Sequence, residues 1–122
     1  MIERRLTVVY ADDDDSVRET ISELLTLEGV DVHACSDGTE ALILCEQMDP
    51  DVLLLDLNMP GVDGLKVAKQ LRRTPRSRHL RLVAFTGHGT WELRKKAMEA
   101  GFDEFVTKPA SAEVLIRALR ST

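Results

Sequence analysis

Cysteines, aromatic residues and long hydrophobic runs are scarce in this 122-residue chain, which has two cysteines and 4% aromatic residues. The longest wholly apolar run is the segment 41–45, whereas a membrane-spanning helix needs roughly 20 apolar residues. The same run is too short for the hydrophobic region of a signal peptide. Cys35 and Cys45 have no metal-binding or redox spacing, and so few thiols favour a reducing compartment. We therefore expect a cytoplasmic protein with no membrane partner.

An excess of positive charge is also absent, because 16 Lys and Arg residues stand against 21 Asp and Glu residues, for a formal net charge of −5. Proteins that bind nucleic acid are usually basic, so we expect no direct contact with nucleic acid. The basic stretch at residues 66–81 is interpreted as a solvated surface, since no recognition helix or aromatic stacking platform accompanies it. Hydrophobic residues make up 43% of the chain, which argues against disorder and is enough for a core. We expect residues 1–122 to form a single domain.

Short apolar segments alternate with amphipathic ones along the chain. We expect strands at residues 6–11, 30–35, 52–55, 80–86 and 102–107. A helical pattern follows each strand, with expected N-caps at Asp37, Asp63, Thr90 and Ser111 and expected ends at Gly29 and Gly101. In the last helix we expect Val114, Leu115, Ala118 and Leu119 to face inward. Strands that alternate with helices form right-handed βαβ units, so the predicted fold class is α/β with a doubly wound, five-stranded parallel sheet.

Polar residues stand where four of the expected strands end. Asp12 and Asp13 follow the first strand, Asp56 the third, Thr86 ends the fourth and Lys108 follows the fifth. Ligands of doubly wound sheets bind beyond the carboxyl ends of the strands, so these side chains should share one cleft. Carboxylates that lie close together repel one another, and a magnesium ion with its preference for oxygen ligands would neutralise them.

This set of groups suits phosphoryl transfer, which depends on positioning and charge neutralisation. Taken alone, Asp56 is more readily interpreted as a helix cap or a turn residue. Beside the other strand-end residues, it is the expected nucleophile, because a carboxylate can accept a phosphoryl group as an acyl phosphate. Lys108 and Thr86 would then bind the remaining phosphoryl oxygens.

Four segments in order, 8–13, 56–64, 85–87 and 101–109, make the chain resemble the receiver domain of two-component response regulators over essentially its whole length. The resemblance implies a flavodoxin-like sheet with strand order 2-1-3-4-5. It implies Asp56 as phosphoacceptor, Thr86 and Lys108 as phosphoryl-binding residues, and Mg²⁺ as cofactor, with Mn²⁺ as an alternative. The implied metal ligands are Asp12, Asp13, Asp56 and the backbone carbonyl of Asn58.

The resemblance also implies residues that tune the switch. Phe105 stands where the family has an aromatic switch residue. Gly87 stands where the family usually has alanine or another small residue, which would open the cleft slightly. His88 is either an exposed loop histidine or a residue that controls access of water to the acyl phosphate. Trp91 either packs partly on the sheet or contacts a partner.

The run of four aspartates at residues 12–15 leaves the metal-ligand register open. The family often has a basic residue five positions after its second acid, and Arg18 has this spacing from Asp13. We therefore assign Asp12 and Asp13 to the metal site. Asp14 and Asp15 are expected at the start of the first helix, where negative charge is favourable. His33 and His79 show no motif and are expected at the surface.

The resemblance implies a signalling switch that takes its phosphoryl group from a histidine kinase or a histidine phosphotransfer protein. An output partner or a second copy would bind the face formed by the fourth helix, the fifth strand and the fifth helix. We expect no multiple turnover on external substrates. A magnesium phosphohydrolase is a weaker alternative, because such sites commonly have a second acid two residues after the nucleophile and Asn58 stands there. A binding module that has lost phosphorylation is disfavoured by the intact acidic, Thr86 and Lys108 positions.

Overall fold

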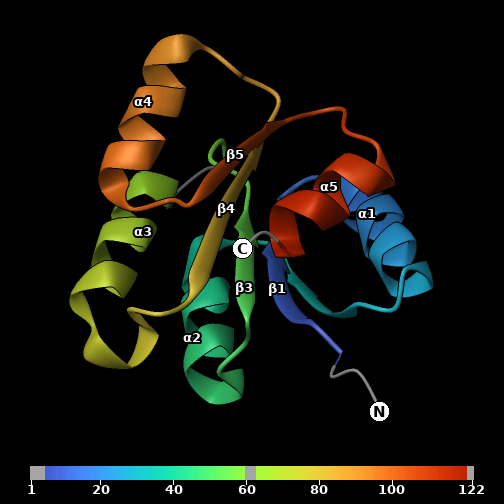
Figure 1. Ribbon diagram of the computed structural model, residues 1–122, viewed down its shortest axis with the longest axis horizontal. Coiled ribbons are helices and arrows are strands. Elements are labelled where there is room, and N and C mark those ends of the chain that lie inside the picture. The colour runs from blue at the N-terminus through green and yellow to red at the C-terminus, as the bar shows by residue number, and fades with distance from the viewer. Residues whose placement is uncertain (1–4, 60–62, 121–122) are drawn as a thin grey trace.

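The computed structural model describes residues 5–59 and 63–120. Within these ranges the elements are β1 (Thr7–Ala11), α1 (Asp15–Leu27), β2 (Asp31–Cys35), α2 (Gly38–Met48), β3 (Val52–Leu55), α3 (Gly64–Arg73), the 3₁₀ turn η1 (Pro75–Ser77), β4 (Arg81–Thr86), α4 (Trp91–Ala100), β5 (Glu104–Thr107) and α5 (Ala112–Arg120). Figure 1 shows them along the chain. None of these helices is long and apolar enough to cross a membrane.

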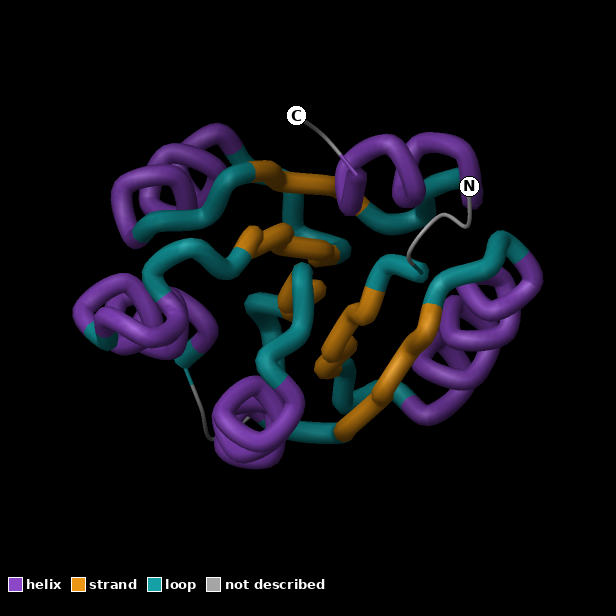
Figure 2. Tube along the Cα trace, turned by 60° about the horizontal axis from the view of Figure 1, so that its bottom comes forward, coloured by secondary structure: helices purple, strands orange, loops and turns teal. Residues whose placement is uncertain are grey.

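The strands form one parallel sheet in the order β2-β1-β3-β4-β5, which confirms the predicted fold and strand order. Helices α1 and α5 lie together on one side of the sheet, and α3 and α4 lie on the other (Figures 1 and 2). Helix α2 packs on the same side as α3 and α4. Its buried Ala41 and Cys45 belong to the hydrophobic layer on that side. Covering on both faces is what a parallel sheet requires.

Central strands supply both layers of the core by alternation of their side chains. On β3, Leu53 and Leu55 pack toward α2, α3 and α4, whereas Val52 and Leu54 pack toward α1 and α5. All four are at most 1% exposed. The unbroken apolar sequence of this strand therefore reflects burial on both faces.

All four predicted N-caps are confirmed by side-chain acceptors of backbone N–H groups. The pairs are Asp37 with Glu40, Asp63 with Leu65, Thr90 with Leu93 and Ser111 with Val114. Asp14, one of the two aspartates placed at the start of the first helix, caps α1 through the N–H of Val17.

Four strands begin later than predicted: β1 by one residue, and β2, β4 and β5 because an apolar residue ahead of each strand closes the preceding turn. The N–H of Val30 binds the carbonyl of Leu25, and the N–H of Phe102 binds that of Ala97. Leu80 makes the equivalent bond to Ser77. These residues are buried like strand residues, but their N–H groups complete helix or turn ends and not the ladder.

Val114 and Trp91 are more exposed than inward packing on the sheet would allow. Val114 was predicted to face inward and is 48% exposed, because the inward stripe of α5 consists of Leu115, Ala118 and Leu119. Val114 lies about 40° around the helix from Ala118 and about 100° from Leu115, at the edge of that stripe. Trp91 is 70% exposed, which does not fit packing on the sheet. His79 is exposed as predicted, whereas His33 is half-buried.

Candidate functional site

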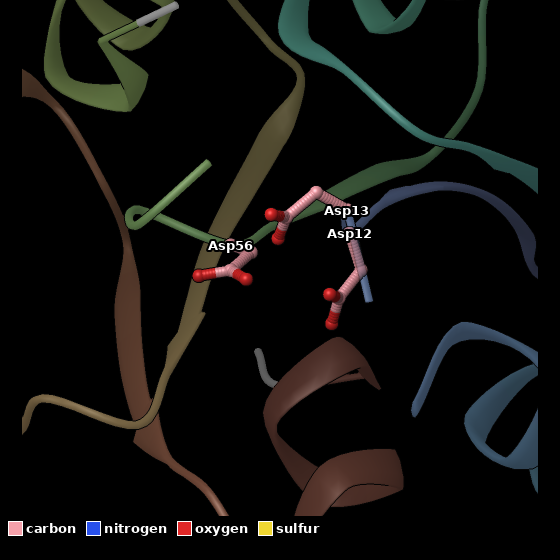
Figure 3. A group of neighbouring side chains, drawn as sticks. All are labelled: Asp12, Asp13 and Asp56. Carbon is pink, nitrogen blue, oxygen red and sulfur yellow. The ribbon is translucent and has the colours of Figure 1, made fainter. Parts of the chain in front are cut away.

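Parallel register brings the predicted site residues to the carboxyl edge of the sheet. Ala11 pairs with Leu55, and the N–H of Asp56 binds the carbonyl of Ala11 at 3.0 Å, so Asp12 and Asp56 leave adjacent strands at the same level. Figure 3 shows Asp12, Asp13 and Asp56 converging on a common space. One carboxylate oxygen from each lies within 4.8 Å of the other two. The predicted cluster of three carboxylates is therefore formed.

Lys108 joins two of these carboxylates from the end of β5. Its Nζ lies 2.6 Å from Asp12 Oδ2 and 3.2 Å from Asp56 Oδ2. Asp12 is fully buried and Asp56 is 5% exposed, whereas Asp13 is exposed to solvent. Two buried negative charges thus share one ammonium group, and the third carboxylate faces water.

Burial and charge act in opposite directions on these groups. Burial raises the pKa of Asp56, although the N–H of Asn58 and the charge of Lys108 oppose that rise. Burial disfavours the charge on Lys108, but hydrogen bonds and attraction to Asp12 and Asp56 outweigh it and raise the pKa of Lys108. Lys108 is therefore held as a cation inside the cleft.

Tyr10 is a site residue that was not predicted from the sequence. Its hydroxyl donates to Asp12 Oδ2 at 2.8 Å. The other oxygen, Asp12 Oδ1, accepts the N–H of Asp14 at 3.0 Å. The available signal was period-two spacing, since residues 10 and 12 project to the same side of an extended chain. In the sequence, Tyr10 stands two positions before Asp12, so its hydroxyl can be expected on the same side as that acid.

Thr86 lies buried at the end of β4 with its hydroxyl in a hydrogen-bond network. Its Oγ1 accepts from Asn58 Nδ2 and from the N–H of His88, the latter at 3.3 Å. The N–H of Asn58 in turn donates to Asp56 Oδ1 at 2.9 Å. Asn58 therefore connects the phosphoacceptor candidate to Thr86. The metal role of its backbone carbonyl stays a prediction, and residues 60–62 of that motif lie outside the described ranges.

Comparison with known proteins decides the family. The family model of the response regulator receiver domain matches residues 8–120. The chain belongs to the response regulator receiver domain family. Response regulator MprA of Mycobacterium leprae is 34% identical over 116 residues, which are 95% of this chain and 50% of that protein. MprA of Mycobacterium avium gives the same identity and coverage. The chain thus spans about half the length of these curated relatives.

Solved structures agree with this assignment. The chemotaxis response regulator CheY4 of Vibrio cholerae has a TM-score of 0.87 at 27% identity, covering 95% of this chain and 97% of that one. A putative response regulator from Chloroflexus aurantiacus has a TM-score of 0.88 at 29% identity, covering 95% and 98%.

The switch candidates of this receiver domain lie apart from the acidic cleft or at its rim. Phe105 is 5% exposed and belongs to the hydrophobic layer under α2, α3 and α4, with the guanidinium of Arg94 5.6 Å from its ring centre. Gly87 and His88 are exposed in the loop after β4. In that loop, a Cβ added to Gly89 would lie 2.6 Å from Thr107 Oγ1, so the loop rests directly on β5.

The donor set of the cleft fits a hard divalent cation. Asp12, Asp13 and Asp56 offer only carboxylate oxygens, which Mg²⁺ prefers. Exposure of Asp13 leaves one side open for the water molecules that Mg²⁺ usually keeps. Lys108 neutralises one of the two buried charges, so a cation would compensate the remainder.

Proposed function

We propose that this receiver domain accepts a phosphoryl group on Asp56 from the phosphohistidine of a histidine kinase or histidine phosphotransfer protein, in the cytoplasm. The observation that carries the proposal is a buried carboxylate beside two further carboxylates and one ammonium. Asp12 and Asp13 would hold Mg²⁺, or Mn²⁺ in its place, together with Asp56 and the backbone carbonyl of Asn58. The ion would supply charge neutralisation for the phosphoryl oxygens.

In the transfer step, a carboxylate oxygen of Asp56 attacks the phosphorus in line with the leaving imidazole. The phosphorus–nitrogen bond breaks, its electron pair stays on the imidazole nitrogen, and an oxygen–phosphorus bond forms on Asp56. Lys108 already contacts Asp56 Oδ2 and would exchange that contact for a phosphoryl oxygen. Thr86 Oγ1 accepts two hydrogen bonds in the structure, so its own hydrogen is free to donate to another phosphoryl oxygen.

The conformational response would follow from these new contacts. Attraction of Thr86 to the phosphoryl group would shift the loop after β4, which rests on β5 through Gly89. Phe105 is already turned inward in the structure. The phosphoryl group would therefore favour an arrangement that the unmodified chain can adopt, as expected of a pre-existing equilibrium.

The face formed by α4, β5 and α5 is our proposed output surface. A groove on this face is lined by Arg94, Phe105 and Val106 on one side and by Val114 and Arg117 on α5. The exposed Val114 gives it apolar character, and Arg94, Arg117 and Glu104 line it with charges of both signs. A partner or a second copy that buries Val114 would be sensitive to the state of Phe105. We propose no multiple turnover on external substrates.

Intact mass after incubation with acetyl phosphate tests the phosphoacceptor. We expect one added phosphoryl group on the wild-type chain, only with Mg²⁺, and none on Asp56→Asn. Asp15→Asn is the matched control, since Asp15 is exposed and contacts Arg18. It should take up the group like wild type. Full uptake by Asp56→Asn would refute the assignment.

A further inference from the structure

The only tyrosine of the chain sits directly beneath the acidic cleft. Tyr10 is 0% exposed on β1, with its ring in the layer covered by α1 and α5. Its ring centre lies 6.4 Å from that of Phe85. The hydroxyl reaches past this apolar layer to Asp12, so the polar tip of a core side chain forms part of the cleft.

The Asp12 carboxylate is held by donors on both of its oxygens. Oδ2 accepts from Tyr10 Oη at 2.8 Å and from Lys108 Nζ at 2.6 Å, while Oδ1 accepts from the N–H of Asp14 at 3.0 Å. The donors differ in kind. Tyr10 and Asp14 are fixed by the strand and the helix start, whereas Lys108 is a flexible side chain that also contacts Asp56.

We propose that Tyr10 is a positioning residue of the cation site, which fixes the Asp12 carboxylate through its hydroxyl and keeps it bonded when Lys108 turns to the phosphoryl group. The inference rests on the proposed function, in which Asp12 contributes to Mg²⁺ binding and Lys108 binds phosphoryl oxygen. It adds a residue outside the set of strand-end groups.

The physical reason is the cost of a buried charged oxygen without a donor. If Lys108 moves to the phosphoryl group, Tyr10 is the donor that stays on Oδ2 of the fully buried Asp12. Without the hydroxyl, Oδ2 would depend on Lys108 alone, and a tighter Asp12–Lys108 pair would compete with the cation.

The test is a double-mutant cycle read by Mn²⁺ binding. Electron paramagnetic resonance counts free Mn²⁺ and gives Kd for wild type, Tyr10→Phe, Asp12→Asn and the double variant. We expect Tyr10→Phe to raise Kd by about tenfold, as for one lost hydrogen bond to a charged group. In the Asp12→Asn background the same substitution should leave Kd unchanged, because Tyr10 acts through Asp12.

Val8→Ala is the matched control for packing. Val8 lies on the same strand and the same face as Tyr10, is 0% exposed and is two positions farther from the cleft. Its truncation should lower the thermal midpoint and leave the Mn²⁺ Kd unchanged. A loss of binding in Val8→Ala as large as that in Tyr10→Phe would assign the effect to general destabilisation and overturn the inference.

The unmodified chain offers a second measurement, since ¹³Cζ-tyrosine labelling gives a single resonance. Saturation with Mg²⁺ should shift that signal with the Kd of the metal site. A signal that does not move while Mg²⁺ binds, an unchanged Mn²⁺ Kd in Tyr10→Phe, or an equal change in both backgrounds would each overturn the role of Tyr10. Absence of any cation binding by the wild-type chain would contradict the proposed function itself, and the inference with it.

Discussion

Replacement of Lys108 by methionine removes the ammonium that two buried carboxylates share. The Lys108 side chain is 18% exposed, and its partners Asp12 and Asp56 are 0% and 6% exposed at their side chains. Removing one partner of a buried ion pair costs about 3–5 kcal/mol. We expect about 3 kcal/mol, near the low end, because water can enter past the exposed Asp13. For a domain of this size that corresponds to a fall in Tm of roughly 10 °C.

The pH dependence of this deficit has a definite sign. Burial raises the pKa of Asp56 and Lys108 lowers it, so loss of Lys108 raises that pKa further. A carboxyl group with a higher pKa in the folded than in the unfolded state stabilises the fold in its protonated form, and that stabilisation is lost as pH rises through the folded pKa. The deficit of Lys108→Met should therefore be largest at neutral pH and shrink toward acidic pH.

Mg²⁺ should reduce the loss of stability caused by Lys108→Met. A cation that binds the folded state raises its stability, and in Lys108→Met it no longer competes with the ammonium. The assay is thermal unfolding followed by circular dichroism across pH, with and without Mg²⁺. Lys69→Met, at an exposed position on α3, is the control and should behave like wild type. A fall in Tm no larger than that of Lys69→Met would refute the reasoning. A fall in Tm that changes neither with pH nor with Mg²⁺ would also refute it.

Two further predictions concern backbone and thiols. Gly29 and Gly101 both have positive φ, of 86° and 115°, but a Cβ at Gly29 meets nothing within 4 Å whereas one at Gly101 would lie 2.6 Å from Arg72 Cγ. Gly29→Ala should cost about 1 kcal/mol in urea unfolding and Gly101→Ala clearly more; equal costs would contradict the packing argument. Burial raises the pKa of the Cys35 and Cys45 thiols to about 12, so a thiol reagent at pH 8 should react only after unfolding. Rapid labelling of the folded chain would contradict this.

Strand ends and helix caps were predictable because each depends on local sequence. Asp56 follows an unbroken apolar run, and Asp63 precedes a helical pattern by one residue. The parallel sheet then determines that strand-end residues meet, which is why Asp12, Asp56 and Lys108 were expected together and lie together.

Features that depend on tertiary packing were not predictable from the sequence. The bond from Tyr10 to Asp12 depends on how both side chains turn within the packed layer, and periodicity gives only their side of the strand. The helical spacing of apolar residues predicts Val114 inward with Ala118, but the stripe of α5 that meets the sheet leaves it outside. Phe105 is 5% exposed, and composition and spacing alone do not determine whether its ring lies inward or outward.

Reduction of the phosphorylated protein with borohydride tests the central claim most directly. This reagent converts an aspartyl phosphate to homoserine, and peptide mass spectrometry then locates the converted residue. After treatment with acetyl phosphate and Mg²⁺, our account predicts conversion at position 56 alone, and none without Mg²⁺. Conversion at Asp12 or Asp13, or none in protein that has gained a phosphoryl group by mass, would contradict the assignment of Asp56 as phosphoacceptor.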